Sequence, residues 1–296
     1  MNNTRAIILM VAAMIGFTME DVFIKSMTEG LPVAQVLIFI GIGGSLAFAA
    51  LTLAQRGTLA PLVHRDMRGQ AMLARNFSEG ASTIFFISAL ALVPLSTVAA
   101  VFQATPLAVT AGAAIFLGEQ VGWRRWSAIF VGFVGVMMII RPGGESFDMN
   151  ALLPAITVVG IAARDLITRQ LRPDIPSTSV AFYGFASVLV AGLVILPLSP
   201  EPMAWPTPRG WGLVAGAVIF GVSGYYAIVL AMRMGDAGAV MPFRYTRLVF
   251  SLILGMIVFA ERPDVWTLAG AGLIISTGLY TFLREARLAR KARAAA

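Results

Sequence analysis

The sequence contains no cysteine and a single histidine, His64. The lack of cysteine excludes disulfide bonds, iron–sulfur clusters and zinc sites built from thiolates. One histidine excludes a metal site with two histidine ligands, and the metalloprotease pattern HExxH does not occur. No phosphate-binding loop or dinucleotide-binding glycine motif stands in a suitable context, which excludes an ATP-driven motor. We therefore expect no metal and no cofactor.

Charged residues are also scarce. They make up 12% of the 296 residues, whereas 58% are hydrophobic, and a soluble globular chain has about 25% charged residues. The segment Gly80–Gly118 runs for 39 residues without Asp, Glu, Lys or Arg, and Ile175–Pro200 runs for 26. Apolar stretches longer than about 18 residues are typical of helices that cross a bilayer. The composition predicts an all-α integral membrane protein.

Charges and Pro/Gly breaks divide the chain into ten candidate transmembrane helices. All five tryptophans fall at the ends of these spans, where the membrane meets water. Short connections between spans predict that consecutive helices are antiparallel neighbours. The spans are Arg5–Met27, Pro32–Gln55, Arg68–Leu92, Ser96–Leu117, Trp123–Ile140, Met149–Leu171, Ser179–Leu198, Arg209–Met232, Gly238–Ala260 and Val265–Leu283.

The distribution of basic residues predicts the orientation. With the N-terminus inside, 14 of the 22 Lys and Arg residues lie on the cytoplasmic side and 4 on the outer side. This bias predicts a multi-pass protein of the inner (cytoplasmic) membrane with both termini in the cytoplasm. The net charge of +7 is concentrated in the C-terminal tail. We expect that tail to contact anionic membrane lipids and not nucleic acid.

The two halves of the chain resemble each other. Offsets of 144 and 142 residues superpose charged residues, prolines and span boundaries, so residues 1–145 and 146–296 are predicted to be two five-helix repeats. Because five is odd, the second repeat must cross the membrane in the opposite sense, and inverted repeats of this kind build transporters. The matched positions are Asp21 and Asp165, Lys25 and Arg169, Pro32 and Pro176, Phe39 and Tyr183, Val98 and Val240, and Glu119 and Glu261.

A family resemblance follows from this arrangement. Two five-helix halves, each with a Glu directly after its fourth helix (Leu117-Gly-Glu119 and Phe259-Ala-Glu261), resemble the EamA branch of the drug/metabolite transporter superfamily. Within it, the chain is similar to the YddG-type amino-acid exporters. The resemblance implies secondary transport of small metabolites. The two glutamates themselves are expected to be structural residues at helix ends.

Ionised side chains inside a bilayer are costly and mark functional sites. At 1.5 Å per residue, Glu79 lies roughly 16 Å from the inner face and Arg247 roughly 14 Å, both near the middle of the membrane. Glu20 and Arg164 are equivalent in the repeat and opposite in charge, but their depths differ by roughly 14 Å. The depths therefore favour Glu79 with Arg247, either in a substrate cavity or as a static bridge between helices. Arg75 is expected to reach the head groups.

Polar and aromatic residues at helical spacing accompany these charges and predict a cavity for a zwitterion. A guanidinium would bind the α-carboxylate as a fork, and Glu79 would bind the ammonium group. The predicted substrate-binding residues are Glu79, Arg247, Arg244, Asn76, Thr83, Phe86, Gln103, Pro106, Tyr225, Glu20 and Arg164.

The sequence favours a secondary exporter of small metabolites, above all neutral and aromatic amino acids, that works by alternating access. Efflux of amphiphilic cations or other drug-like metabolites is the alternative within transport. A membrane-embedded enzyme is disfavoured by the lone histidine, so we expect a protein that is not an enzyme. A passive scaffold would require that the intramembrane charges pair with one another and that no cavity lies between the helices. Proton antiport through Glu79 and facilitated diffusion both stay open. We expect a monomer or a weak homo-oligomer.

Overall fold

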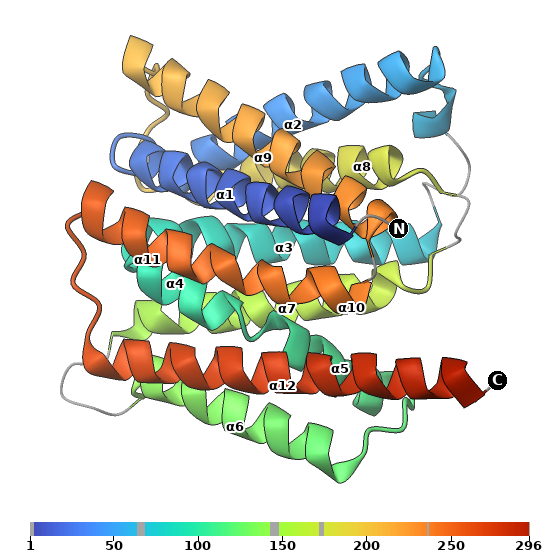
Figure 1. Cartoon of the computed structure of the whole chain (residues 1–296). Coiled ribbons are helices and arrows are strands. Elements are labelled where there is room, and N and C mark those ends of the chain that lie inside the picture. The colour runs from blue at the N-terminus through green and yellow to red at the C-terminus, as the bar shows by residue number, and fades with distance from the viewer. Residues whose placement is uncertain (1–2, 64–68, 143–147, 172–174, 236, 296) are drawn as a thin grey trace. The chain divides into compact units, whose positions relative to one another are not determined.

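The computed structural model of the chain describes residues 3–63, 69–142, 148–171, 175–235 and 237–295 (Figure 1). His64 lies outside these ranges. Every regular element within them is helical. The elements are α1 (Asn3–Thr28), α2 (Val33–Arg56), η1 (Ala60–Val63), α3 (Gln70–Leu92), α4 (Leu95–Phe102), α5 (Thr105–Phe116), α6 (Trp123–Ile140), η3 (Met149–Leu152), α7 (Leu153–Thr168), α8 (Ser177–Ile195), η4 (Leu196–Leu198), α9 (Pro208–Met234), α10 (Ala237–Val240), η5 (Met241–Tyr245), α11 (Thr246–Val258) and α12 (Val265–Ala295).

All ten predicted spans are helical, which confirms the fold class. Nine stretches of the described chain are long and apolar enough to cross a membrane. The tenth span is α3, which carries Arg75 and Glu79. The last helix is longer than predicted, because α12 continues past the apolar segment to Ala295.

Two spans that the sequence presents as single helices are broken. The fourth span consists of α4 and α5, and the ninth consists of α10, η5 and α11. Each break has a proline just after it, Pro106 near the start of α5 and Pro242 near the start of η5. Proline cannot donate the backbone hydrogen bond that a continuous helix needs. In the first break, the Thr105 hydroxyl donates to the carbonyl of Phe102 at 2.6 Å instead.

The internal repeat is visible in the helix boundaries. At an offset of 144, α2 and α8 both begin directly after a proline, Pro32 and Pro176. At an offset of 142, the last residues of the two interrupted spans, Phe116 and Val258, correspond to each other. The first residues of the helices that follow, Trp123 and Val265, correspond in the same way. The boundaries 1–145 and 146–296 for the whole repeats stay a prediction.

The turn after the fourth helix is also repeated. Gly118 has a φ of 68° and Ala260, 142 residues later, has a φ of 52°. In both copies the amide of the following glutamate donates to the carbonyl six residues earlier, Glu119 to Ala113 at 3.2 Å and Glu261 to Gly255 at 3.0 Å. The Glu motif that carries the family resemblance therefore ends a helix by the same backbone turn twice.

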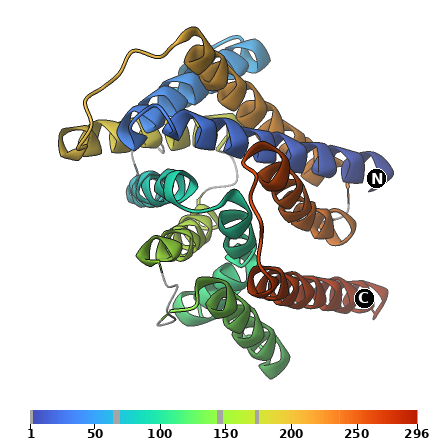
Figure 2. The same ribbon diagram turned by 90° about the vertical axis from the view of Figure 1, so that its left-hand side faces the viewer.

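The chain forms two compact units, and each draws helices from both halves of the sequence. In unit 1, α6 packs on α12 and α4 packs on α11. In unit 2, α2 packs on α8 and α3 packs on both α7 and α8. Figures 1 and 2 show the α6–α12 pair side by side in both views. Unit 1 comprises Met1–Thr18, Pro94–Ala151 and Ser223–Ala296, and unit 2 comprises Met19–Val93 and Leu152–Val222.

Small residues allow the closest helix contacts. A Cβ atom on Gly135 of α6 would lie 2.8 Å from the carbonyl oxygen of Gly270 on α12. A Cβ atom on Gly192 of α8 would lie 2.8 Å from the carbonyl oxygen of Ala34 on α2. Membrane helices associate through such close backbone approach, because lipid supplies no hydrophobic driving force between them.

Glu261 has a structural role within unit 1. Its carboxylate accepts the backbone amides of Leu95 at 2.5 Å and Ser96 at 3.0 Å, and the Ser96 hydroxyl at 2.7 Å. These are the first residues of α4, and no side chain at its own N-cap, Pro94, bonds to them. A carboxylate at a helix N-terminus satisfies free amides and complements the helix dipole. The expectation that this glutamate is structural is confirmed.

We expect Glu261→Ala to lower the stability of the protein by about 1–3 kcal/mol, because it leaves amide donors of α4 without their acceptor. The thermal midpoint of the purified protein in detergent measures the loss. Glu29→Ala removes an exposed carboxylate and serves as the control. Equal midpoints for the two variants would contradict the structural role of Glu261.

Candidate functional site

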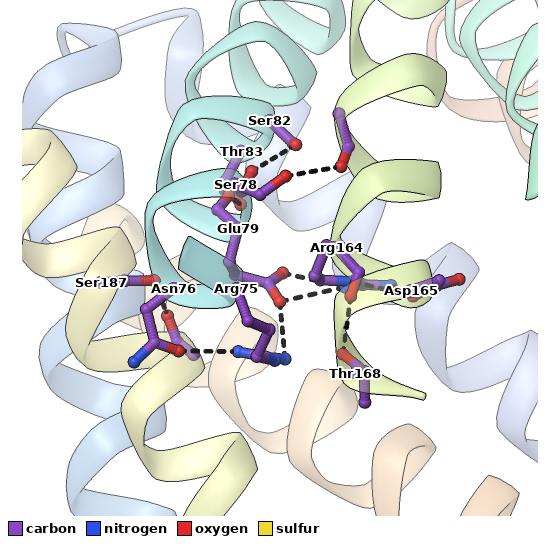
Figure 3. A network of polar contacts seen from close by, with 12 residues as sticks. Arg75, Asn76, Ser78, Glu79, Ser82, Thr83, Arg164, Asp165, Thr168 and Ser187 are labelled. Atoms are coloured by element: carbon purple, nitrogen blue, oxygen red, sulfur yellow. Dashed lines mark hydrogen bonds and ion pairs between the residues drawn. The ribbon is translucent and has the colours of Figure 1, made fainter. Parts of the chain in front are cut away.

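Four charged residues of unit 2, Arg75, Glu79, Arg164 and Asp165, form one network on α3 and α7 (Figure 3). Both oxygens of Glu79 accept from Nη1 of Arg164, at 3.0 and 3.1 Å. Oε2 of Glu79 also accepts from Nη2 of Arg75, one helical turn earlier on α3, at 2.8 Å. A single carboxylate therefore holds two guanidinium groups.

The network continues on both sides of Glu79. Arg164 donates to Oδ1 of Asp165 from Nε at 2.9 Å and from Nη2 at 2.7 Å. Arg75 donates to Oδ1 of Asn76 at 3.0 Å. Two cations and two anions thus balance in charge. The Glu79 side chain is 14% exposed and that of Arg75 is 9% exposed, so these pairs act in a region of low dielectric.

The close packing of α3 and α7 brings these charges together. The Ser78 hydroxyl donates to the carbonyl of Gly160 at 2.8 Å across the two helices. Any Cβ atom at Gly160 would overlap the Ser82 side chain. Because α7 presents only a backbone at this point, Arg164, one turn further on, lies within reach of Glu79.

The network bears on three predictions from the sequence, which concern Arg75, Arg164 and the pairing of Glu79 with Arg247. Arg75 does not extend to the head groups: it is 7% exposed and pairs with Glu79, a partner that the spacing of four residues on one helix could have indicated. Arg164, for which depth disfavoured a pairing with Glu20, pairs with Glu79 of α3. The pairing of Glu79 with Arg247 stays a prediction, since Arg247 belongs to unit 1.

Glu20 lies at the position related to Arg164 by the repeat, on the seam between α1 and α9 in unit 2. A Cβ atom on Gly221 would lie 2.7 Å from the Glu20 carboxyl carbon, so this carboxylate packs directly on the backbone of α9. Nearby, Phe23 and Phe220 stack with ring centroids 5.6 Å apart. At an offset of 142, Gly221 corresponds to Glu79. Equivalent positions of the two repeats thus differ: Arg164 and Glu79 form an ion pair between α7 and α3, whereas Glu20 packs on Gly221 between α1 and α9.

In unit 1, Arg247 lies between two aromatic rings. Its guanidinium carbon is 5.5 Å from the ring centroid of Phe17 on α1 and 5.0 Å from that of Phe102 at the end of α4. A cation at this distance is attracted to the ring face. Phe102 and Arg247 flank the breaks in the two discontinuous spans, so the cluster lies where the helices are interrupted.

Gln103 joins the two breaks directly. It follows the last residue of α4, is 8% exposed, and donates from Nε2 to the carbonyl of Arg244 in η5 at 3.4 Å. The helices that begin after the breaks, α5 and α11, start at Thr105 and Thr246. The N-terminus of a helix that starts within the membrane carries partial positive charge and attracts anionic groups.

The structure divides the predicted site residues between the two units. In unit 2, the Thr83 hydroxyl donates to the carbonyl of Glu79 at 2.8 Å. In unit 1, Tyr225 directly follows Gly224, and the backbone of Gly224 lies against Phe17. Sequence reasoning missed Phe17 and Phe102, which nothing in the local pattern distinguishes from other apolar positions. Unit 2 contains Glu20, Asn76, Glu79, Thr83, Phe86 and Arg164, and unit 1 contains Gln103, Pro106, Tyr225, Arg244 and Arg247.

Comparison with known proteins places the chain in a family. Residues 4–141 and 149–283 each match the EamA-like transporter family. The protein therefore belongs to this family of the drug/metabolite transporter superfamily, and the duplicated match agrees with the two repeats. A multi-pass membrane transporter of small metabolites is the class of protein that the fold defines.

Several characterised relatives are transporters. An S-adenosylmethionine uptake transporter of Rickettsia felis is 33% identical over 199 residues, which cover 66% of each chain. A riboflavin transporter of Rhizobium johnstonii is 29% identical over 95% of this chain and 92% of its own. A pseudopaline exporter of Pseudomonas aeruginosa is 27% identical over 91% of this chain and 93% of its own.

A solved structure has the same fold. A crystal structure superposes on 93% of this chain and 96% of its own, with a TM-score of 0.64. At 19% sequence identity, this similarity concerns the fold alone.

Proposed function

We propose that this EamA-family protein exports small zwitterionic metabolites, with neutral and aromatic amino acids as the leading substrates, by alternating access around a site at the middle of the membrane. The observation that supports this is Arg247, whose guanidinium lies between Phe17 and Phe102 at the breaks of two discontinuous spans. A guanidinium binds a carboxylate as a fork, and the flanking rings offer apolar surface to a substrate side chain.

The ammonium group of the substrate needs an acceptor, for which the sequence prediction is Glu79. Both oxygens of Glu79 already accept from Arg75 and Arg164. A substrate ammonium would therefore compete with two guanidinium groups. Glu20 is the other predicted carboxylate, and transport by Glu20→Gln and Glu79→Gln separates the two assignments.

The substrates named for the relatives share parts of this chemistry. S-adenosylmethionine carries an α-amino and an α-carboxyl group attached to a nucleoside, and riboflavin contains a fused aromatic ring. The carboxylate of the first compound suits the guanidinium, whereas riboflavin, which has no carboxylate or ammonium group, shares only the aromatic character that suits the ring walls. They join the amino acids as compounds to test.

Transport by the purified protein in lipid vesicles tests the proposal. Vesicles are loaded with labelled Phe, Met or Thr, and in parallel with labelled S-adenosylmethionine or riboflavin. We expect Phe to leave faster than from vesicles without protein, and an excess of unlabelled substrate to compete. If none of the three amino acids leaves faster than from protein-free vesicles, the amino-acid assignment is wrong.

Efflux of amphiphilic cations is the second candidate. The rings of Phe17 and Phe102 could attract a cation, which is the observation in its favour. However, Arg247 already lies against both rings, and its positive charge would repel a cationic substrate. The response to removal of Arg247 distinguishes the two functions, as argued in the Discussion.

We further propose that the protein lies in the inner membrane with both termini in the cytoplasm. The support is the excess of basic residues on one side of the predicted spans. Labelling of single cysteines tests this orientation directly, because the chain contains no cysteine of its own. Cysteines introduced at Arg56 and at Glu201 are expected to react from opposite sides of the membrane.

A further inference from the structure

A groove of about 300 Å³ opens between α6 and α12 within unit 1. Its walls combine aromatic rings, hydroxyl groups and a guanidinium, and none of its lining residues is acidic. The volume is at the small end of ligand pockets, which suits a compact polar group. The lining residues are Trp123, Arg124, Ser127, Ala128, Val131, Ser276, Thr277 and Tyr280.

The groove lies at the end of two membrane spans. Trp123 is the first residue of α6, and the apolar part of α12 ends at Arg284, one turn beyond Tyr280. Trp123 is 73% exposed and Tyr280 is 49% exposed. Tryptophan and tyrosine in such positions occupy the zone of lipid head groups. The polar end of the groove is therefore at head-group depth.

Positive charge surrounds this end of the groove. The guanidinium carbon of Arg124 lies 5.4 Å from the ring centroid of Trp123. On α12, Tyr280 is followed on the same face by Arg284 and Arg287, at helical spacing. The helix continues to Ala295 through three further basic residues. The face of α12 that lines the groove therefore continues toward its C-terminal end with the basic residues Arg284 and Arg287.

The hydroxyl groups in the groove restrict which head group fits. Ser127 donates to the carbonyl of Trp123 at 2.9 Å, Thr277 to that of Leu273 at 2.7 Å, and Ser276 to that of Leu273 at 3.0 Å. Each hydroxyl hydrogen is thus used within its own helix, and the oxygen offers a ligand only lone pairs. The groove suits a head group that combines a phosphate with hydroxyl donors.

We propose that the α6–α12 groove binds the head group of an anionic phospholipid that carries free hydroxyls, of which phosphatidylglycerol is the simplest. Arg124 binds the phosphate as a charged fork. The serine and threonine oxygens accept the glycerol hydroxyls, and the acyl chains follow the apolar surface beyond Val131. This site is separate from the proposed substrate residues, so it does not rest on the transport assignment.

Native mass spectrometry of the detergent-purified full chain tests the site with phosphatidylglycerol, phosphatidic acid and phosphatidylcholine. We expect phosphatidylglycerol to bind most tightly. Arg124→Gln is expected to weaken its binding by about tenfold, through loss of a charge-assisted pair. The matched control Arg56→Gln removes another exposed arginine at a helix end and should leave the affinity unchanged.

Quenching of tryptophan fluorescence gives a second readout, independent of variant stability. Phosphatidylglycerol with brominated acyl chains should quench the wild type, and Trp123→Phe should remove part of that quenching. The proposal is wrong if Arg124→Gln keeps its affinity, or if phosphatidic acid binds as tightly as phosphatidylglycerol. It is also wrong if inorganic phosphate at equal concentration raises the thermal midpoint as much as short-chain phosphatidylglycerol does.

Discussion

Arg247→Ala is expected to weaken transport of zwitterions strongly while leaving the protein folded. A guanidinium that binds a carboxylate contributes about 1.5–3 kcal/mol, so its loss should reduce substrate affinity by about 10-fold to 150-fold. Arg247 is only partly buried, and its removal leaves the rings of Phe17 and Phe102 in place. Initial rates of Phe efflux from vesicles over a range of internal concentrations measure the loss.

Two further variants sharpen this result. Arg247→Lys keeps the charge but loses the planar fork, so we expect transport between wild type and Arg247→Ala. Arg233→Ala removes an exposed arginine from the last turn of α9 and should transport at the wild-type rate. If Arg247→Ala exports amphiphilic cations as well as or better than the wild type while amino-acid transport stays at wild-type rates, the cation function replaces the amino-acid function.

Glu79→Ala is expected to destabilise the protein by about 3–5 kcal/mol, because it removes one partner from a buried ionic network. Buried Arg75 and partly buried Arg164 both lose the Glu79 carboxylate, while Arg164 keeps its pair with Asp165. The thermal midpoint in detergent should fall well below that of Glu201→Ala, which removes an exposed carboxylate.

A double variant tests whether charge or packing causes that loss. Arg75→Met with Glu79→Met replaces the α3 pair by apolar side chains of similar length, and such replacements recover stability in other buried pairs. We expect its midpoint to lie above that of Glu79→Ala. A double variant less stable than Glu79→Ala would show that the unpaired charge of Arg75 does not cause the loss.

The positions of the helices could be predicted from the sequence, because long apolar runs determine which segments insert into a membrane. In the described residues each of the ten predicted spans is helical, and Pro32 and Pro176 mark helix starts in both copies. The interruptions at Pro106 and Pro242 were not predicted as breaks, since hydropathy averages over a window and does not detect a missing backbone hydrogen bond.

The charge partners were harder to predict than the helices. Depth arithmetic places backbone atoms along the membrane normal, but it contains no information on which helices are neighbours. It selected Arg247 for Glu79, which stays a prediction, but it gave no sign of Arg164, which the packing of α3 on α7 brings to that carboxylate. The aromatic partners of Arg247 depend on the same unpredicted neighbourhoods, because Phe17 and Phe102 lie far apart in the sequence.

The two repeats differ chemically at equivalent positions, and this difference bears on the energetics of the proposed alternating-access cycle. Arg164 faces Glu79 on one seam, whereas the related pair on the other seam is Glu20 and Gly221. In a transporter with two identical halves, the states open to either side would have equal free energy. Arg164 and Glu79 form an ion pair on the first seam, whereas on the second the Glu20 carboxylate packs on the backbone of Gly221. Because the two seams differ in this way, we expect the resting population to favour one orientation even without a substrate gradient.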